Sequence, residues 1–155
     1  MKRPRKTDPY NLQRFVDAQD EDNKIAQVFS ELRAGKKDDH WMWYIFPQVE
    51  GLGDSEMSRA FAIYSLAEAK AYLAHPLLGT RLRKCSRLVN RVSGRSIDKI
   101  FEYPDNHKFG SSVTLFAHAT SENDVFLESI QKYFDGEFDP LTVKWLANQS
   151  PKDKQ

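Results

Sequence analysis

The sequence predicts an all-α protein, a single-domain orthogonal bundle of about eight to ten short helices. Three observations predict this fold class. Apolar residues recur at spacings of three and four along most of the chain, as on the buried face of a helix. Capping residues and glycines stand at the ends of these stretches. Alternation with a period of two, the pattern of a half-buried strand, is rare.

The composition fits one globular domain. The chain has 155 residues, 40% of them hydrophobic, and its 23 Lys+Arg nearly balance 22 Asp+Glu. We expect the domain to span residues 8–148, between a disordered basic tail at 1–7 and a disordered tail at 149–155. No secretory signal is visible and no apolar run approaches the roughly 18 residues of a membrane span. We therefore expect a cytoplasmic protein without membrane contact.

The first two helices are predicted by a cap and by a glycine stop. Asp8 before Pro9 is an N-cap followed by proline at the first helical position, and apolar residues follow at helical spacing. A second helical repeat covers residues 25–32 and ends at Gly35. Residues 40–46 can form either a buried helix or a short strand, because the apolar residues of this aromatic-rich run show no clear periodicity.

Serines predict the next helix starts. Ser55 can cap one segment, and Ser65 with Glu68 forms a capping box that opens an alanine-rich helix. The longest apolar stripe then covers residues 78–92 and ends at Gly94. Four further signals predict helix starts in the last third of the chain: Ser96, Ser111 or Ser112, the run 121–124, and the pair Asp139-Pro140.

The segment from His40 to Gln48 holds two tryptophans, a tyrosine and a phenylalanine in nine residues. Trp41, Trp43 and the tyrosine are too large and too close together for all of them to point into one small core, so we expect at least one to line a surface cleft. An aromatic wall of this kind could bind a flat ring. Trp41 and Trp43 would stack on the ring, and His40 and Gln48 would form hydrogen bonds to its polar edge. His40 is also the best candidate for proton transfer. The alternative is that these rings form the main core of the domain.

A second patch of interest lies at residues 105–114. We expect Ser111 or Ser112 to start a helix, where free backbone N–H groups would bind a phosphate or carboxylate. The hydroxyl of Thr114 and the ammonium of Lys108 would assist. This is not a Walker loop, because Lys108 precedes the glycine. The alternative is an ordinary N-cap beside a solvated lysine.

A basic stripe occupies residues 81–95, which include six cations and no acidic residue: Arg81, Arg83, Lys84, Arg87, Arg91 and Arg95. The stripe can bind an acidic partner, or it can be a solvated face that is paired within the molecule. Nucleic acid is not expected, because a dedicated nucleic-acid domain is more basic overall than this nearly neutral chain.

The remaining chemistry-bearing residues predict no further site. The four histidines show no HExxH motif and no i,i+4 pairing, so we expect no metal ion, and nothing in the chain indicates a cofactor. The only cysteine, Cys85, excludes an intramolecular disulfide and is interpreted as a buried core thiol. No residue is assigned a catalytic role.

Several motifs resemble one family: residues 8–19 (DPYNLQRFVDAQ), 40–48 (HWMWYIFPQ), 72–79 (YLAHPLLG) and 108–116 (KFGSSVTLF). The chain resembles, over roughly residues 8–147, a bacterial and fungal family of small helical proteins catalogued as a domain of unknown function. Some members carry the label "calpastatin", which no residue here supports. The resemblance implies one all-helical domain and no established activity. Asp39 stands where the family more often has serine, and Val113 where methionine is commoner.

Two functions lead, and a nucleic-acid binder ranks last. The first is binding of a small ligand that bears a phosphate or carboxylate, in an aromatic-lined cleft joining residues 40–53 to 107–116. A nucleotide is one such ligand, and the motif Phe15-x-x-Ala-Gln19, similar to one in helical proteins that process ADP-ribose derivatives, implies an ADP-ribose-like one. The second is a non-catalytic protein-interaction module that uses the basic stripe, with a partner the sequence does not identify.

Overall fold

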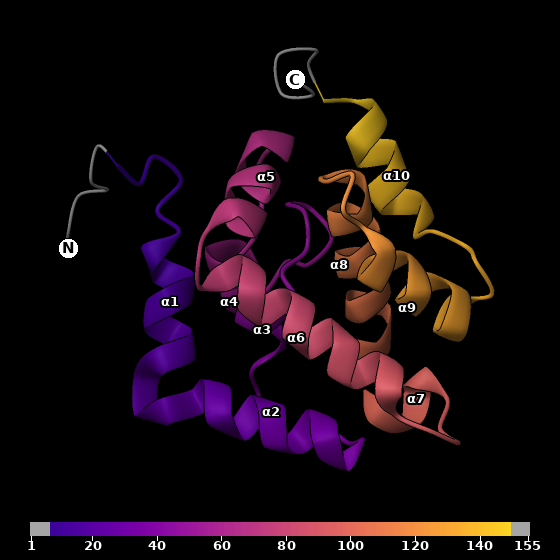
Figure 1. The fold of residues 1–155 in the computed structure, drawn as a ribbon. Coiled ribbons are helices and arrows are strands. Elements are labelled where there is room, and N and C mark those ends of the chain that lie inside the picture. The colour runs from indigo at the N-terminus through magenta and orange to yellow at the C-terminus, as the bar shows by residue number, and fades with distance from the viewer. Residues whose placement is uncertain (1–6, 150–155) are drawn as a thin grey trace.

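Helix α6 (Leu78–Arg91) crosses the front of the molecule, and most of the other helices pack beside and behind it (Figure 1). The computed structural model describes residues 7–149. Within that range the chain forms ten α-helices and one 3-10 turn, and the only extended pairing is an isolated bridge between Val49 and Ile63. The predicted all-α fold class is confirmed.

The other elements, in chain order, are α1 (Gln13–Asp20), the 3-10 turn η1 (Glu21–Asn23), α2 (Lys24–Ala34), α3 (Met42–Ile45), α4 (Glu56–Ala60), α5 (Leu66–Ala74), α7 (Ile97–Ile100), α8 (Asp105–His118), α9 (Asp124–Phe134) and α10 (Pro140–Ala147). The tails expected at 1–7 and 149–155 lie outside the described residues, apart from Thr7 and Gln149. Their disorder and the domain limits at 8 and 148 stay predictions.

Most of the predicted helix ends are confirmed by the caps that the structure contains. The hydroxyl of Ser65 accepts from the Glu68 N–H at 3.0 Å, and a carboxylate oxygen of Asp139 accepts from the Thr142 N–H at 3.0 Å. Gly35 ends α2 in the left-handed conformation, with φ of 78°. These signals work because each cap satisfies a backbone group only a few residues away.

Two predicted helix starts were wrong. The first helix begins at Gln13 and not beside Pro9, because residues 8–11 form a turn in which Asn11 has φ of 51°. The Asp8 carboxylate still accepts from the N–H groups of Leu12 and Gln13, at 2.7 and 3.0 Å. The second error concerns α8, which begins six residues before Ser111.

The segment at residues 40–46 contains the short helix α3, and most of its side chains lie in the core, whereas His40 is exposed. Trp41 and Phe46 are fully buried. The Phe46 ring packs edge-on against Phe109 of α8, with 5.0 Å between centroids, and Trp41 packs edge-on against Phe101 at 6.3 Å. This aromatic cluster joins the segment after α2 to the second half of the chain.

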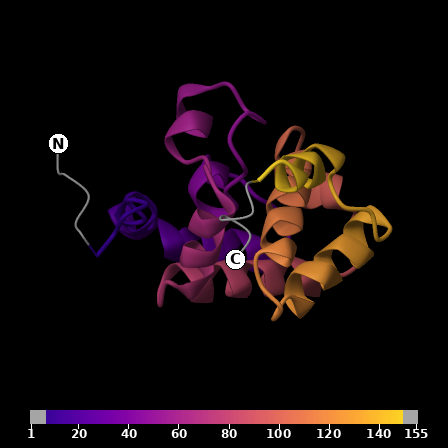
Figure 2. The ribbon, with the colours of Figure 1, turned by 90° about the horizontal axis from the view of Figure 1, so that it is seen from above.

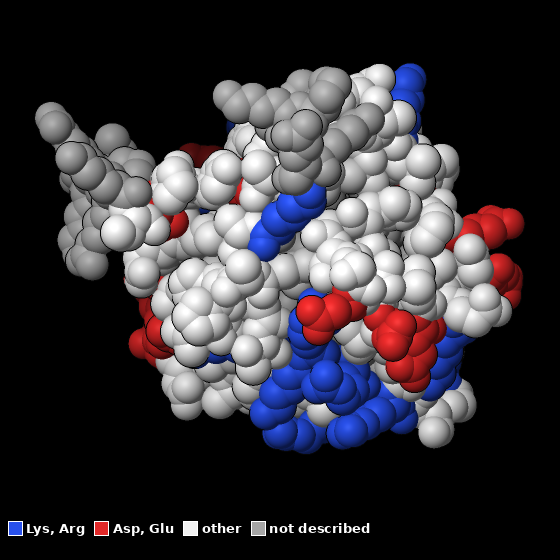
Figure 3. Space-filling model, turned by 45° about the horizontal axis from the view of Figure 1, so that its top comes forward, with Lys and Arg blue, Asp and Glu red and all other residues white. Residues whose placement is uncertain are grey.

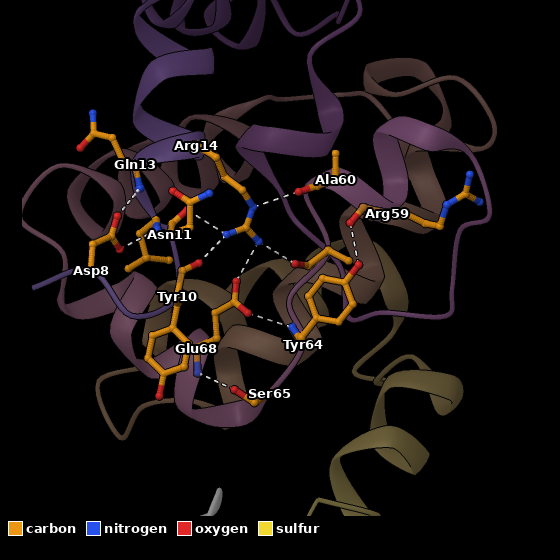
Figure 4. Close-up of polar contacts among 12 residues, drawn as sticks. Asp8, Tyr10, Asn11, Gln13, Arg14, Arg59, Ala60, Tyr64, Ser65 and Glu68 are labelled. Carbon is orange, nitrogen blue, oxygen red and sulfur yellow. Dashed lines mark hydrogen bonds and ion pairs between the residues drawn. The ribbon is translucent and has the colours of Figure 1, made fainter. Parts of the chain in front are cut away.

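Arg14 of α1 fastens three parts of the fold together (Figure 4). All five of its N–H groups are used: they donate to the backbone carbonyls of Tyr10, Asn11, Ala60 and Ala62 and to Glu68 Oε2, at distances of 2.7 to 2.9 Å. The other carboxylate oxygen of Glu68 accepts from the Tyr64 N–H at 3.0 Å. The clamp holds α1, the 60–64 segment and α5 in register.

Helices α5 and α6 approach each other closely at Gly79. A Cβ atom on Gly79 would lie 2.0 Å from the backbone oxygen of Leu73. Only glycine allows this approach. Seen from above, the segment that carries α4 lies on the side of the molecule opposite α6 (Figure 2).

Candidate functional site

The predicted ligand patch is only partly assembled. Trp41 is sealed in the core, and its Nε1 donates to Glu31 Oε1 at 3.0 Å, so it does not line a cleft. His40 is exposed on the surface. Trp43, Gln48 and Lys108 do meet, around one small hollow that also contacts Gly53 and Ser58. The predicted approach of the 40–53 and 107–116 segments therefore holds for these three residues.

The hydroxyl groups of the predicted anion cradle lie inside α8. Ser111 Oγ donates to the His107 carbonyl at 3.1 Å, and Thr114 Oγ1 donates to the Gly110 carbonyl at 2.7 Å. Ser112 and Thr114 are fully buried. Because these residues lie within the helix, most of their backbone N–H groups are used by its ladder, and the free helix N-terminus expected here is wrong.

Gly110 explains why the sequence suggested a helix boundary at this point. It lies in the interior of α8, where a Cβ atom would be 3.0 Å from Cζ of Phe134. The missing side chain lets the Phe134 ring of α9 rest on α8. A glycine that serves packing between two helices has the same local appearance as a glycine that ends a helix.

The hollow beside Trp43 is very small in this structure, with a volume of about 10 Å³. Lys108 Nζ lies 5.4 Å from the centroid of the Trp43 ring. The same ammonium is 3.9 Å from Asp105 Oδ1, whereas Lys37 Nζ holds the other oxygen of Asp105 at 2.8 Å. A nucleotide does not fit in this space as it stands.

Glu31 is a polar anchor that the sequence analysis missed. Its carboxylate accepts from the backbone N–H groups of Asp38 and Asp39, from Gln27 and from the indole of Trp41. Burial opposes ionisation and alone would raise the Glu31 pKa, but these hydrogen bonds together hold the pKa below its ordinary value. Glu31 thereby ties the 38–41 turn to α2.

We predict that Glu31→Gln lowers the free energy of unfolding by about 1 to 2 kcal/mol at neutral pH, because hydrogen bonds to a charged acceptor are lost. A carboxylate with a depressed folded-state pKa stabilises the protein fully above its unfolded value, near 4.5, and loses this effect as the pH falls through the folded-state pKa. Urea denaturation over a pH series measures both effects. The difference between the parent and Glu31→Gln should shrink in acid, whereas Glu128→Gln, at an exposed carboxylate of α9, should match the parent throughout.

A larger feature lies over α6, where a groove of about 410 Å³ runs between α6 and the end of α2. We call it the cationic groove, and it is lined by Arg33, Thr80, Arg83, Lys84, Arg87, Leu88 and Arg91. Figure 3 shows the patch of Lys and Arg side chains on this face, with carboxylates along one edge. The sequence analysis predicted the α6 cations but missed Arg33, which comes from the last turn of α2.

One alternative expected the basic stripe to be paired within the molecule, but the cations of the groove form no ion pair with any residue that the structure describes. Of the six cations of the basic stripe, only Arg81 forms an ion pair within residues 7–149, with Asp20 Oδ1 at 2.9 Å, and Arg81 lies outside the groove. Arg33, Arg87 and Arg91 are exposed and have no carboxylate within ion-pair distance among residues 7–149. Lys84 Nζ lies 4.1 Å from the centroid of the Phe29 ring, which fixes it at the wall of the groove.

Arg83 and Arg87 also line a second hollow on the opposite flank of α6. That hollow, of about 540 Å³, contains three carboxylates, from Glu122, Asp124 and Glu128. Arg83 Nη1 donates to the backbone carbonyl of Glu122 at 2.7 Å. The two arginines therefore form a ridge, with only cations on the α2 side and acidic groups on the α9 side.

Three other residues that the sequence analysis considered are buried in the core. Burial raises the pKa of the Cys85 thiol to about 12, so the predicted core thiol is confirmed. Phe15 and Gln19, which carry the similarity to ADP-ribose-processing proteins, are buried, and Gln19 Nε2 donates to the Tyr44 carbonyl at 2.7 Å.

Among residues 7–149, no three His, Cys, Asp or Glu side chains gather as a metal site. No helix in the same range is both long and apolar enough to cross a membrane.

Comparisons with known proteins give a family and a structure but no activity. A family model described as "Protein of unknown function (DUF1810)" matches residues 9–146. The conserved hypothetical protein Rv1873 from Mycobacterium tuberculosis is 51% identical in sequence to this chain, and its crystal structure matches this fold with a TM-score of 0.87. The match covers 90% of this chain and 99% of that one. No curated protein matches the sequence. The predicted resemblance to a helical family of unknown function is confirmed.

Proposed function

Because the chain belongs to the DUF1810 family of proteins of unknown function, its own surface is the guide to its role, and we propose that it binds an acidic segment of a partner protein in the cationic groove. One observation carries the proposal. Five cationic side chains line a single groove of about 410 Å³, and none of the residues lining it is acidic. Of the two functions left open by the sequence, the geometry favours the interaction module, because the aromatic hollow measures only about 10 Å³.

The side chains of the groove suit carboxylates. Four of the five cations are arginines, whose planar guanidinium groups can each hold a carboxylate through two parallel hydrogen bonds. Arg33, Arg87 and Arg91 are exposed and unpaired within residues 7–149, so a partner would displace no internal ion pair at these positions. The lining residues of α6 run from Thr80 to Arg91, a length of about 16 Å along the helix, which matches a short peptide segment.

The surroundings of the groove favour an acidic peptide over nucleic acid. The whole chain carries a formal charge of only +1. The acidic hollow on the other flank of the Arg83–Arg87 ridge would repel a long phosphate backbone that continued past the groove. A short acidic segment can remain on the α2 side, where every charged group is cationic.

Binding of a labelled glutamate-rich peptide, followed by fluorescence anisotropy, tests the proposal. Arg87→Glu is expected to weaken binding about tenfold, because it replaces an attraction by a repulsion in the middle of the groove. Lys144→Glu makes the same change of charge on an exposed position of α10 and should leave the affinity unchanged. Rising salt should weaken binding to the parent protein.

Two results would contradict the proposal. One is equal weakening by Arg87→Glu and Lys144→Glu, which would show only an effect of total charge. The other is tighter binding of a single-stranded oligonucleotide of the same charge as the peptide, which would make the groove a nucleic-acid site. Arg87 is exposed, so its substitution should alter the free energy of unfolding by less than about 0.5 kcal/mol.

A further inference from the structure

The indole of Trp43 stands apart from the other two indoles of the chain. Trp41 Nε1 donates to the carboxylate of Glu31 at 3.0 Å, and Trp145 Nε1 donates to the carboxylate of Glu50 at 2.9 Å. Trp43 Nε1 is buried, but within the described residues it has no hydrogen-bond partner. A buried donor left without an acceptor costs about 1 to 3 kcal/mol, so such a group in a native protein has an unobserved partner or a function.

Trp43 shares its hollow with a cation and an amide. Lys108 Nζ lies 5.4 Å from the Trp43 ring centroid, and its ion pair with Asp105 is long, at 3.9 Å, because Lys37 holds that carboxylate at 2.8 Å. Gln48 also lines the hollow. Three residues whose side chains carry N–H donors, Trp43, Gln48 and Lys108, therefore line the same hollow.

The volume of the hollow limits what can enter. About 10 Å³ is close to the roughly 10–15 Å³ that one water molecule needs, and one ligand oxygen is of similar size. A planar carboxylate can place one oxygen in the hollow while its second oxygen and the rest of the ligand stay at the mouth. A nucleobase or a sugar ring cannot enter without movement of the wall.

We propose that Trp43, Gln48 and Lys108 form a binding site for the carboxylate of a small organic acid. One carboxylate oxygen accepts from Trp43 Nε1, and the other faces the Lys108 ammonium and the Gln48 amide. This geometry gives Trp43 the same kind of acceptor that Trp41 and Trp145 have within the chain. The site joins Trp43 of α3, Gln48 of the segment after α3 and Lys108 of α8, and it shares no residue with the cationic groove, so it is independent of the function proposed there.

Titration with sodium acetate, followed through the indole N–H resonances in nitrogen-15 NMR spectra, tests this site. Trp43→Phe assigns the Trp43 signal. The expected result is a saturable shift of that signal at millimolar acetate, while the Trp41 and Trp145 signals stay in place. Sodium chloride at the same ionic strength should not reproduce the shift.

Lys108→Met provides the decisive variant, because it removes the charge and keeps an apolar side chain against the Trp43 ring. We expect the acetate affinity to fall at least about tenfold in Lys108→Met and to be unchanged in Lys144→Met. A shift that fails to saturate, that chloride reproduces, or that Lys108→Met leaves intact would overturn the proposal. Arg87→Glu should bind acetate like the parent, so failure at one site is distinguishable from failure at the other.

Discussion

Gly79→Ala is expected to destabilise the protein by about 3 kcal/mol. The added Cβ atom would lie 2.0 Å from the backbone oxygen of Leu73, far inside van der Waals contact. Backbone cannot rotate away as a side chain can, so α5 and α6 must separate and lose packing along their crossing. Alanine favours a helix over glycine by about 1 kcal/mol, so helix propensity acts in the opposite direction and cannot explain a loss.

Urea denaturation monitored by circular dichroism measures this effect. Gly110→Ala is the matched control, since it makes the same change inside α8 but meets the ring of Phe134 at 3.0 Å, which can shift. We expect it to cost less than about 1 kcal/mol. Stability of Gly79→Ala equal to that of the parent would mean that α5 and α6 do not cross this closely.

The clamp between Arg14 and Glu68 should have an effect of similar or greater size. Arg14→Met leaves the Glu68 carboxylate, whose side chain is 5% exposed, without its cation, and removes the guanidinium donor from four backbone carbonyls. Removing one partner of a buried pair costs about 3 to 5 kcal/mol. We therefore expect Arg14→Met to lower the free energy of unfolding by that amount.

A double-mutant cycle separates the ion pair from the rest of the clamp. Arg14→Met combined with Glu68→Gln should cost less than the two single changes together, because the unpaired charge is then absent. Arg14→Lys should be intermediate, since an ammonium keeps the charge but cannot donate in five fixed directions. Additive costs in the cycle would show that the two side chains are not coupled.

Much of the fold was predictable because its signals are local. Ser65 and Asp139 each cap a backbone N–H three residues ahead, and Gly35 ends α2 through its own conformation. The α8 boundary failed for the opposite reason. Gly110 serves a contact with Phe134, 24 residues later, and nothing beside it in the sequence reveals that contact.

The candidate sites were predictable only in part. The α6 cations were predicted from sequence because they repeat along one helix, whereas Arg33 joins them across the α2–α6 packing. Trp41 and Trp43 look alike in the sequence, two residues apart. Glu31 and the surrounding rings seal the first, and Lys108 partly covers the second.

The sequence by itself determined the all-α class, most of the helical segments and which helix carries the basic face, because periodicity and caps act within a few residues. The tertiary structure decided which indole is left without an acceptor and which cations share a groove. Those outcomes depend on contacts between residues far apart in the chain, and such contacts are set by how whole helices pack.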